Sequence, residues 1–351
     1  MKIILFEDSK VNGMLLRDAI DHALRKTGEV ILFQPVQLGE EGTYEKRLEK
    51  ELSGAPFRKA SLIVADLDLS SSEQYRGLSE AIVRTVANTL AVPECSYARG
   101  ADRDAELVHS AEQRESVIAV TLKDGPEKFA DQVISIALGF EEIKGRLQED
   151  LGNQKSPGKL LATILRKPEY ADKISLYASG DQNRLANILS LRGSQDERNR
   201  RVSCTLGYWL WDSVLRYPGV VVNGVAAASY LNIHEEAFLG DKSVAELFQR
   251  ARYDGPFANA KEALWWRGML DDIVANSDAE DGRDFASREL NRQIRRSECC
   301  ENPERVAGYY CMLGRKPVSF ENSKGGLPWF PRGADLARVS KSKYDELGPW
   351  L

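Results

Sequence analysis

The sequence predicts an α/β fold with a five-stranded parallel sheet for residues 1–145, followed by a mostly α-helical C-terminal part. Two observations predict the α/β fold. Short apolar runs alternate with amphipathic stretches of helical spacing, as in successive βαβ units, and a polar residue closes, or nearly closes, most of these runs. In addition, the six tryptophans all lie after residue 201, which indicates a separate C-terminal domain.

The expected elements of the first domain follow from these runs and from the turn-forming residues between them. The expected strands are Lys2–Phe6, Glu29–Phe33, Ser61–Ala65, Ala91–Cys95 and Ser116–Leu122. The expected helices are Val11–Lys26, a charged stretch within Gly39–Arg58, Leu78–Leu90, Asp102–Arg114 and Pro126–Leu138.

Five polar residues stand at or next to the ends of four of these strands. Glu7 and Asp8 follow the first strand, and Asp66 follows the third. Ser96 follows the fourth strand, and Lys123 follows the fifth. Because ligands of a parallel α/β sheet bind in the crevice at the carboxyl ends of its strands, we expect these residues to share one small site.

Three carboxylates, a hydroxyl and an ammonium suit metal-assisted phosphoryl chemistry. Clustered carboxylates repel one another unless a hard cation lies among them, and Mg²⁺ prefers oxygen ligands. One carboxylate can then act as a nucleophile toward a phosphoryl group. Asp66 is the expected nucleophile, because it ends the most continuously apolar and therefore central strand. Lys123 and Ser96 would supply a positive charge and a donor to the phosphoryl oxygens.

With this set of residues the first 145 residues resemble the receiver domain of two-component response regulators. The run Ala60–Ser70 (ASLIVADLDLS) is similar to the family's phosphoacceptor strand. Ser96 lies 30 residues after Asp66, which is the family's usual separation, and Lys123 follows in the family's order. The resemblance implies a flavodoxin-like (βα)5 fold with a parallel five-stranded sheet.

The resemblance also implies a role for each residue. Glu7, Asp8 and Asp66 would hold Mg²⁺, together with the backbone carbonyl of Asp68. Asp66 would be phosphorylated by a histidine kinase or a phosphotransfer protein. Ser96 would report phosphorylation, and Lys123 would pair with the acyl phosphate.

Several positions depart from the family's pattern. Ser70 and Asp124 stand where proline is usual, and Val120 stands where an aromatic switch residue is common. The connection that contains Gly39–Arg58 is longer than usual. The phosphorylation chemistry is expected to be intact. The relay from the Ser/Thr hydroxyl to the aromatic switch residue is not expected to be intact, and Tyr97 is the candidate to replace that aromatic residue.

Simpler interpretations of the same residues stay open. Glu7 and Asp8 could form a solvated loop, and Asp66 could cap the following helix, since aspartate is a favoured N-cap residue. Lys123 taken alone fits an ordinary surface lysine. A degenerate receiver that kept the residues and lost turnover is a further alternative.

The composition is typical of a globular protein of two or three domains. The 351 residues carry a formal net charge of −5, which does not favour binding to nucleic acid or membrane. The chain begins directly with a strand, with no expected signal peptide, and has no apolar run of about 20 residues. The five cysteines are scattered without zinc-type spacing; a metal site at Cys299, Cys300 and Cys311 is a weak alternative to free thiols. We therefore expect a cytoplasmic protein.

After the receiver-like part we expect a helical linker region over residues 146–201, with a boundary at Gly152–Gly158 and a charged turn at Gly193–Arg201. Residues 202–351 would form a mostly helical output or interaction domain, whose tail after Ser319 wraps the helices. Within it, Ala226–Ile233 (AAASYLNI) is similar to the first half of a helix-turn-helix, although no basic helix follows. Four arginines suggest a basic helical face: Arg288, Arg292, Arg295 and Arg296.

Three functions are compatible with these features. The first is a phosphorylated response regulator whose C-terminal domain contacts a protein partner, with a homodimer possible. The second is a phosphate sink that competes for a kinase, for example in an anti-phage signalling system. The third, a DNA-binding transcriptional regulator, is not favoured because of the acidic composition. No motif of a separate catalytic domain is found in the C-terminal part.

Overall fold

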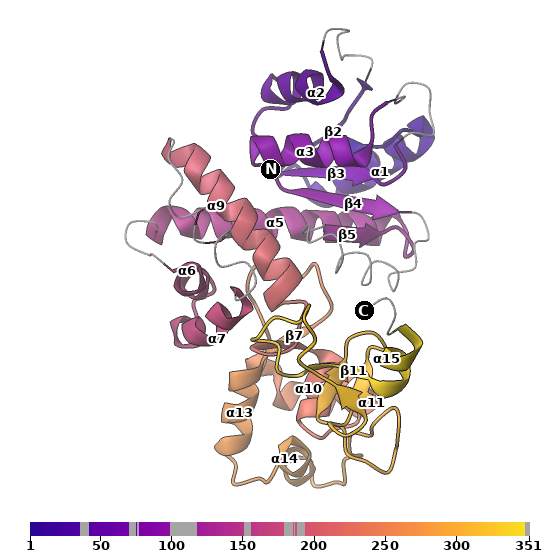
Figure 1. Cartoon of the computed structure of the whole chain (residues 1–351), viewed down its shortest axis with the longest axis vertical. Helices are drawn as coiled ribbons and strands as arrows, with labels where there is room; N and C mark the ends of the chain where they lie inside the picture. The colour runs from indigo at the N-terminus through magenta and orange to yellow at the C-terminus, as the bar shows by residue number, and fades with distance from the viewer. Residues whose placement is uncertain are drawn as a thin grey trace. The chain divides into compact units, whose positions relative to one another are not determined.

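The computed structural model describes residues 1–35, 42–69, 75, 77–98, 118–150, 156–178, 185, 187 and 194–347, with residues 148–150 described by their backbone alone. Figure 1 shows the chain. It divides into two compact units. Unit 1 comprises residues 1–102, 115–153 and 187–208, and unit 2 comprises residues 103–114, 154–186 and 209–351.

Unit 1 contains a five-stranded, all-parallel sheet. Its strands are β1 (Lys2–Phe6), β2 (Glu29–Leu32), β3 (Leu62–Asp66), β4 (Glu94–Ala98) and β5 (Ile118–Thr121). They are arranged in the order β2-β1-β3-β4-β5, which is the order of doubly wound, flavodoxin-like sheets. All five residues of β3 are buried, as is usual for a central strand that is covered on both faces. The predicted α/β class and the five-stranded parallel sheet are thus confirmed.

Four helices connect or follow these strands in the described part of unit 1. They are α1 (Lys10–Leu24), α2 (Tyr44–Ser53), α3 (Glu80–Leu90) and α5 (Pro126–Asp150). Helix α1 packs beside α5, and α2 packs beside α3. Ser9 and Ser79 cap α1 and α3 through their hydroxyl groups, as serine commonly does at helix N-termini. The predicted fourth helix, Asp102–Arg114, lies outside the described residues.

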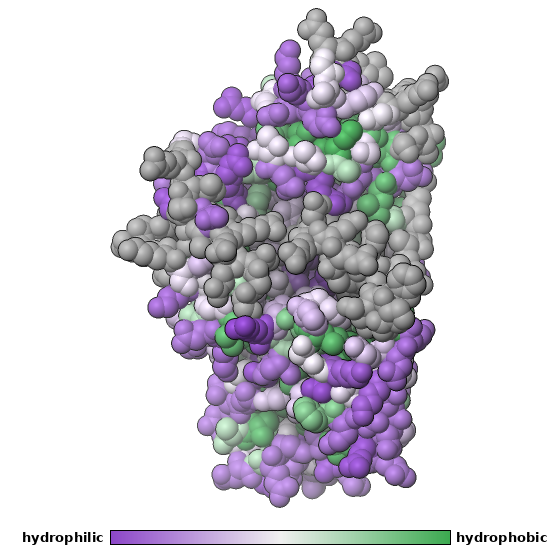
Figure 2. All heavy atoms as spheres, viewed as in Figure 1, coloured by the Kyte–Doolittle hydropathy of each residue, from purple (hydrophilic) through white to green (hydrophobic). Residues whose placement is uncertain are grey.

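The core under α2 and α3 joins these helices to the sheet. Phe6 and Ile63 of the sheet pack there with Leu48 of α2 and Val83 of α3. Figure 2 shows hydrophobic side chains (green) that reach the surface between hydrophilic ones over α2 and α3. The core on this side of the sheet therefore extends from the strands to α2 and α3.

A helix from far along the chain completes unit 1. Helix α9 spans Gln195–Trp209, and its residues up to Tyr208 belong to unit 1. The ring of Tyr208 lies edge-on to that of Phe140 of α5, at 5.4 Å between centroids. At Gly207 an added Cβ would lie only 2.3 Å from the Phe140 ring, so glycine permits the close approach. The charged turn predicted at Gly193–Arg201 is corrected to helix from Gln195 onward.

The predicted linker also differs from the structure. Helix α5 continues to Asp150, beyond its predicted end at Leu138, and α6 begins at Pro157. Of the predicted boundary Gly152–Gly158, residues 152–155 lie outside the described part of the chain.

Unit 2 combines short helices with two small sheets. In the described part of this unit, the helices of four or more residues are α6 (Pro157–Ile164), α7 (Ala171–Ser175), a π-helical segment (Leu210–Val214), α10 (Gly224–Tyr230), α11 (Glu235–Gly240), α12 (Lys242–Leu247), α13 (Arg267–Ala275), α14 (Gly282–Glu289) and α15 (Lys341–Leu347). Short 3-10 turns lie at Pro168–Tyr170, Leu176–Ala178 and Gln249–Ala251.

The strands of unit 2 are short. Strands β6 (Val221–Asn223) and β7 (Leu264–Trp266) pair antiparallel. A second sheet has the order β10-β11-β8-β9 and is built from β8 (Tyr309–Cys311), β9 (Lys316–Val318), β10 (Ser323–Lys324) and β11 (Ala337–Ser340).

The prediction of a mostly helical C-terminal domain therefore missed these strands. Trp265 and Trp266 lie in strand β7 of this domain. The tail after Ser319 was expected to be irregular, yet it supplies β10 and β11 to the second sheet. Strands of two to four residues are too short to show an alternating pattern, which explains why periodicity did not reveal them.

Candidate functional site

Three acidic side chains meet at the carboxyl edge of the sheet in unit 1. Glu7 and Asp8 follow β1, and Asp66 is the last residue of the neighbouring strand β3. One carboxylate oxygen from each residue lies within 4.8 Å of those of the other two. Glu7 and Asp66 are only 2% and 6% exposed, and Asp8 is partly buried. The structure thus brings together the three carboxylates that were expected to share a site.

Hydrogen bonds hold two of these carboxylates in place. Oε1 of Glu7 accepts the backbone N–H of Ser9 at 2.9 Å, and Oε2 accepts the hydroxyl of Tyr97 at 2.6 Å. Oδ1 of Asp66 accepts the backbone N–H of Asp68 at 3.1 Å. A carboxylate has about four lone-pair positions, so carboxylates that accept such hydrogen bonds can also bind a metal ion.

The donor set fits a hard divalent cation. Each of the three side chains offers an oxygen ligand, as Mg²⁺ and Ca²⁺ require, and Mg²⁺ needs only one or two carboxylates because it retains several waters. Two of the carboxylates are buried, so their mutual repulsion is weakly screened. In the described part of the chain this is the one cluster of three or more metal-binding side chains. The predicted metal contact through the backbone carbonyl of Asp68 stays a prediction.

Lys123 lies near this edge of the sheet but is not joined to the acidic cluster. It is exposed on the turn after β5, and its backbone N–H donates to Oγ1 of Thr121 at 3.2 Å. Its ammonium makes no hydrogen bond or ion pair with the residues that the structure describes. The proposed contact between Lys123 and a phosphorylated Asp66 therefore stays a prediction.

The expected position of Ser96 at a strand end is corrected. Strand β4 begins at Glu94 rather than Ala91 and ends at Ala98, so Ser96 is its middle residue. Successive side chains of a strand point to opposite faces. Consequently Tyr97, which is opposite Asp66 in the register, reaches Glu7, whereas the hydroxyl of Ser96 contacts Glu80 of α3.

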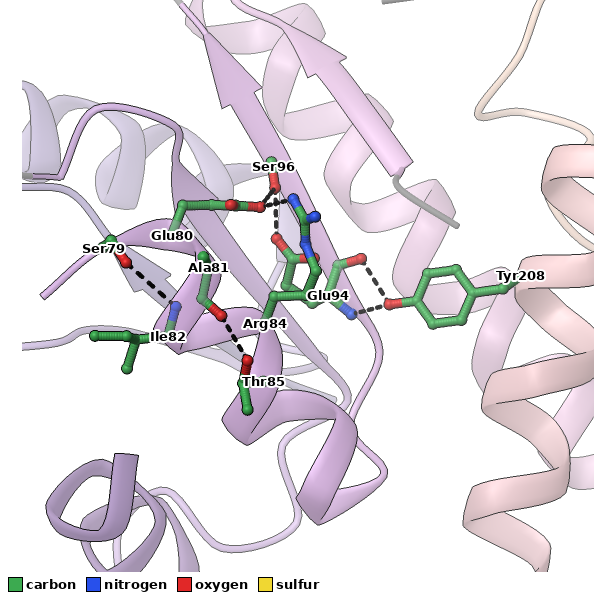
Figure 3. A network of polar contacts seen from close by, with 9 residues as sticks. All are labelled: Ser79, Glu80, Ala81, Ile82, Arg84, Thr85, Glu94, Ser96 and Tyr208. Carbon is green, nitrogen blue, oxygen red and sulfur yellow. Dashed lines mark hydrogen bonds and ion pairs between the residues drawn. The ribbon is translucent and has the colours of Figure 1, made fainter. Parts of the chain in front are cut away.

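Ser96 belongs to a buried polar network that the sequence did not reveal (Figure 3). Its Oγ lies 2.6 Å from Oε1 of Glu80 and 2.6 Å from Oε1 of Glu94. A hydroxyl has one proton and can donate to only one of these oxygens. The other contact becomes favourable when one carboxyl group is protonated and donates to Ser96. We infer that the network holds one proton on its pair of glutamates.

Electrostatics indicate which glutamate carries this proton. The guanidinium of Arg84 hydrogen-bonds to Glu80, while its Nε lies 3.7 Å from Oε2 of Glu94. Burial raises the pKa of Glu94 to about 7; the hydrogen bond from Ser96 opposes this rise, the charge of Glu80 adds to it, and Arg84 opposes it. Arg84 thus interacts most closely with Glu80, and Glu94 holds a proton below about pH 7.

The same network joins helix α9 to the sheet. The hydroxyl of Tyr208 accepts the backbone N–H of Glu94 at 2.7 Å and donates to its carbonyl at 2.9 Å. One helical turn before Tyr208, the thiol of Cys204 contacts the carbonyl oxygen of Ala91 at 3.2 Å. Figure 3 shows Tyr208 pointing from α9 toward Glu94, on which both helices α3 and α9 converge. In the sequence, the one sign of this network is a charged residue, Glu94, within the expected strand Ala91–Cys95.

The features predicted in the C-terminal part take a different form in unit 2. Helix α11 begins with Glu235 and Glu236 and contains no basic residue, so the helix-turn-helix resemblance has no basic recognition helix at this position. Helix α14 ends at Glu289, so the four arginines do not share one helix. Each arginine has partners: Arg288 with Asp284, Arg292 with Asp241, Arg295 with Glu298, and Arg296 with the carbonyls of Pro303 and Glu304.

The cysteines of unit 2 do not form a cluster of three metal ligands in the described part of the chain. Cys299 and Cys311 are buried, whereas Cys300 is exposed. The sulfur of Cys311 accepts the backbone N–H groups of Gly314 and Ser340, each at 3.2 Å. These bonds account for the polar surroundings of Cys311 without a metal.

Within the described residues, no helix combines the length and the apolar character that crossing a membrane requires. No protein-family model matches this chain, and neither the curated proteins nor the solved structures contain a match to it.

Proposed function

We propose that this protein is a response-regulator-like phosphoacceptor in which Asp66 receives a phosphoryl group from a histidine kinase or a phosphotransfer protein. One observation carries the proposal. The three carboxylates of Glu7, Asp8 and Asp66 meet at the carboxyl edge of a parallel sheet with the order β2-β1-β3-β4-β5, where α/β folds of this kind bind their ligands.

The proposal gives each side chain a task. Oδ1 of Asp66 accepts a hydrogen bond from the backbone of Asp68, and a carboxylate oxygen of Asp66 would be the attacking atom. A new P–O bond forms at this oxygen while the P–N bond to the donor imidazole breaks. The imidazole nitrogen keeps the electron pair and takes a proton from solvent. Glu7, Asp8 and Asp66 would hold Mg²⁺, which neutralises charge on the phosphoryl oxygens.

An exposed apolar surface beside the acidic cluster supports a protein as the phosphodonor. Val11, Met14 and Leu15, in the first two turns of α1, are 78%, 42% and 53% exposed, and Leu67, next to Asp66, is 44% exposed. Large apolar side chains gathered around a site commonly mark a protein contact. A kinase or phosphotransfer domain seated on this surface would place its phosphohistidine near Asp66.

The position of Ser96 favours a second candidate function, a phosphate sink that drains phosphoryl groups from a kinase. Ala98, which has no hydroxyl, ends β4, and Ser96 is bonded to Glu80 and Glu94 instead. The hydroxyl through which receivers sense phosphorylation therefore does not face Asp66. A phosphate sink needs the phosphoacceptor chemistry alone. The acidic start of α11 gives no support to the third candidate, a DNA-binding regulator.

Intact-mass measurement after incubation with a small phosphodonor and Mg²⁺ tests the phosphoacceptor. We expect one added phosphoryl group on the full-length chain and none on Asp66→Asn. Asp68→Asn is the matched control, since it neutralises a neighbouring carboxylate and keeps the nucleophile. Phosphorylation that persists in Asp66→Asn would refute the assignment. A change in protease sensitivity on addition of beryllofluoride would separate a switched output from a passive sink, which predicts no change.

A further inference from the structure

A cavity of about 260 Å³ lies in unit 1 at the edge of the sheet opposite the acidic cluster. Ile4 and Ile63 line it from the amino halves of β1 and β3, and Val92 lines it from just before β4. Its other walls come from the end of α2, the α2–β3 connection, the end of α3 and helix α9. The cavity is therefore separate from the site at Asp66.

The cavity has an apolar floor. Ile4, Leu52, Phe57 and Ile63 are each less than 5% exposed and lie in the same hydrophobic core. Leu90 packs against this core from α3. A floor of this kind suits a hydrocarbon or an aromatic ring rather than a bare inorganic ion.

The rim of the cavity is strongly basic. Four cations line it, namely Arg58, Lys59, Arg200 and Arg201, against the single carboxylate of Glu197. Arg201 already interacts with Glu197 at 3.4 Å and donates to the carbonyl of Thr89 at 3.1 Å. The local positive charge thus exceeds the negative charge even after this pair is formed.

Three of these cations retain hydrogen-bonding capacity. Nε of Arg200 is buried and makes no hydrogen bond to the described residues; its nearest acidic partner is Asp196, at 3.7 Å. Arg58 and Lys59 are exposed at the rim, and their charged groups form no ion pair within the described part of the chain. A buried N–H group without an acceptor is costly, so an anionic ligand at Arg200 would relieve an existing deficit.

We propose that this cavity binds a small organic anion, with a compact apolar body on the floor and a carboxylate or phosphate group between Arg200 and the Arg58–Lys59 rim. Guanidinium groups suit both oxoanions, because their N–H groups match carboxylate and phosphate geometry. Ligand pockets commonly have volumes of roughly 300–1,000 Å³, so a cavity of about 260 Å³ takes a compact ligand of a single ring or a short chain.

Such a ligand would also strengthen the attachment of α9. Arg200 lies on α9, whereas Phe57, Arg58 and Lys59 lie on the connection between α2 and β3. An anion held by both segments binds only while α9 is seated, and a ligand that binds one state stabilises that state by mass action. The site would therefore couple the concentration of a small molecule to the docking of α9 in unit 1.

Ligand-observed NMR titration of the full-length chain with benzoate tests the site. Benzoate cannot donate a phosphoryl group, so its binding is independent of the chemistry at Asp66. We expect benzoate to bind at least tenfold more tightly than benzyl alcohol, which lacks the charge, and than acetate, which lacks the ring. Equal binding of benzyl alcohol, or no benzoate binding at millimolar concentration, would overturn the proposal.

Charge-neutralising variants locate the binding. Arg200→Gln should weaken benzoate binding roughly tenfold, the effect of losing one charge-assisted hydrogen bond. Because Arg200 lies on a docked helix, the paired variant Arg58→Gln/Lys59→Gln provides a second test at exposed positions and should weaken binding similarly. Arg288→Gln in unit 2 is the matched control and should leave binding unchanged. Wild-type affinity in both cavity variants would place any bound benzoate elsewhere.

Discussion

Tyr97 donates its phenolic hydrogen to Oε2 of Glu7 over 2.6 Å, and both side chains are buried. The bond connects β4 with the acidic cluster that follows β1. Glu7 belongs with Asp8 and Asp66 to one group of carboxylates. Through Tyr97, an uncharged residue, strand β4 therefore contacts the candidate metal site.

Replacing Tyr97 with phenylalanine should destabilise unit 1. The change leaves one oxygen of a buried carboxylate without its donor, and hydrogen bonds to charged groups contribute about 1.5–3 kcal/mol. We expect urea unfolding without metal, followed by circular dichroism, to show a loss of this order. Tyr344→Phe is the control, since the contact of that ring with the ammonium of Lys324 does not involve its hydroxyl. Equal stability of Tyr97→Phe and wild type would contradict the role of the bond.

Asp8→Asn should have opposite effects with and without Mg²⁺. Without metal, removing one of three clustered negative charges reduces repulsion and should raise the melting temperature. The affinity of the variant for Mg²⁺ should be at least roughly tenfold lower than that of the wild type, because the loss of residues that support a metal site commonly lowers metal affinity by this factor or more. Melting temperature as a function of Mg²⁺ concentration reports both effects. Asp18→Asn, at an exposed position of α1 beside Arg17, is the control. A Mg²⁺ titration that Asp8→Asn does not alter would remove Asp8 from the site.

Glu94 should make the stability of unit 1 decrease as pH rises. Burial raises its pKa from 4.5 to about 7 in the folded protein. Between these values the folded state keeps a proton that the unfolded state has lost, so the free energy of unfolding falls as pH increases. Above about pH 7 both states are ionised, and this contribution to the slope ends. The charged and titratable groups around Glu94 are Glu80 and Arg84 of α3, Cys95 of β4 and Tyr208 of α9.

Glu94→Gln keeps the shape of the side chain and removes the titration. The variant should therefore lose the dependence of its stability on pH that Glu94 causes. Its free energy of unfolding should exceed that of the wild type at pH 8 by on the order of 1–3 kcal/mol, and by less at pH 5. Urea unfolding at a series of pH values measures this effect. Glu127→Gln, at an exposed position of α5, is the control. A wild-type slope in Glu94→Gln would show that another group causes it.

Tyr208→Phe should loosen helix α9. The tyrosine hydroxyl is the partner of both the N–H and the carbonyl of Glu94, and two buried backbone groups would lose it. Unsatisfied buried polar groups cost about 1–3 kcal/mol each, so amide hydrogen exchange in α9 should accelerate strongly. Exchange in β6 and β7 of unit 2 serves as the internal reference. If exchange in α9 is unchanged, other contacts of the helix, such as that between the Tyr208 and Phe140 rings, are sufficient to hold α9 in place.

The sheet of unit 1 and its acidic cluster could be predicted because their signals are local. Each apolar run marks a strand by its own residues, and a parallel sheet places the carboxyl ends of its strands together. Glu7, Asp8 and Asp66 directly follow or end two such runs, so the packing of β1 beside β3 is enough to unite them.

Ser96 shows why local signals were insufficient for the rest of the site. The apolar residues Ala91 and Val92 suggested an early start to the strand, but Ala91 is the C-cap of α3 and β4 begins at Glu94. The strand therefore runs three residues past its predicted end, so Ser96 lies in its middle and points to the face opposite that of Tyr97. The hydroxyl consequently meets α3, and Tyr97 meets the acidic cluster.

Helix α9 shows the same limit over a longer distance. Its first turns looked like a charged turn, yet Asp196 pairs with Arg200 and Glu197 with Arg201 along the helix. The sequence by itself determined the five strands of unit 1 and the acidic residues that follow or end two of them, because these depend on short-range hydrophobic patterns. Only the tertiary structure decided which face Ser96 occupies, what Tyr208 contacts and where the cavity forms, because the last two depend on packing between segments more than a hundred residues apart.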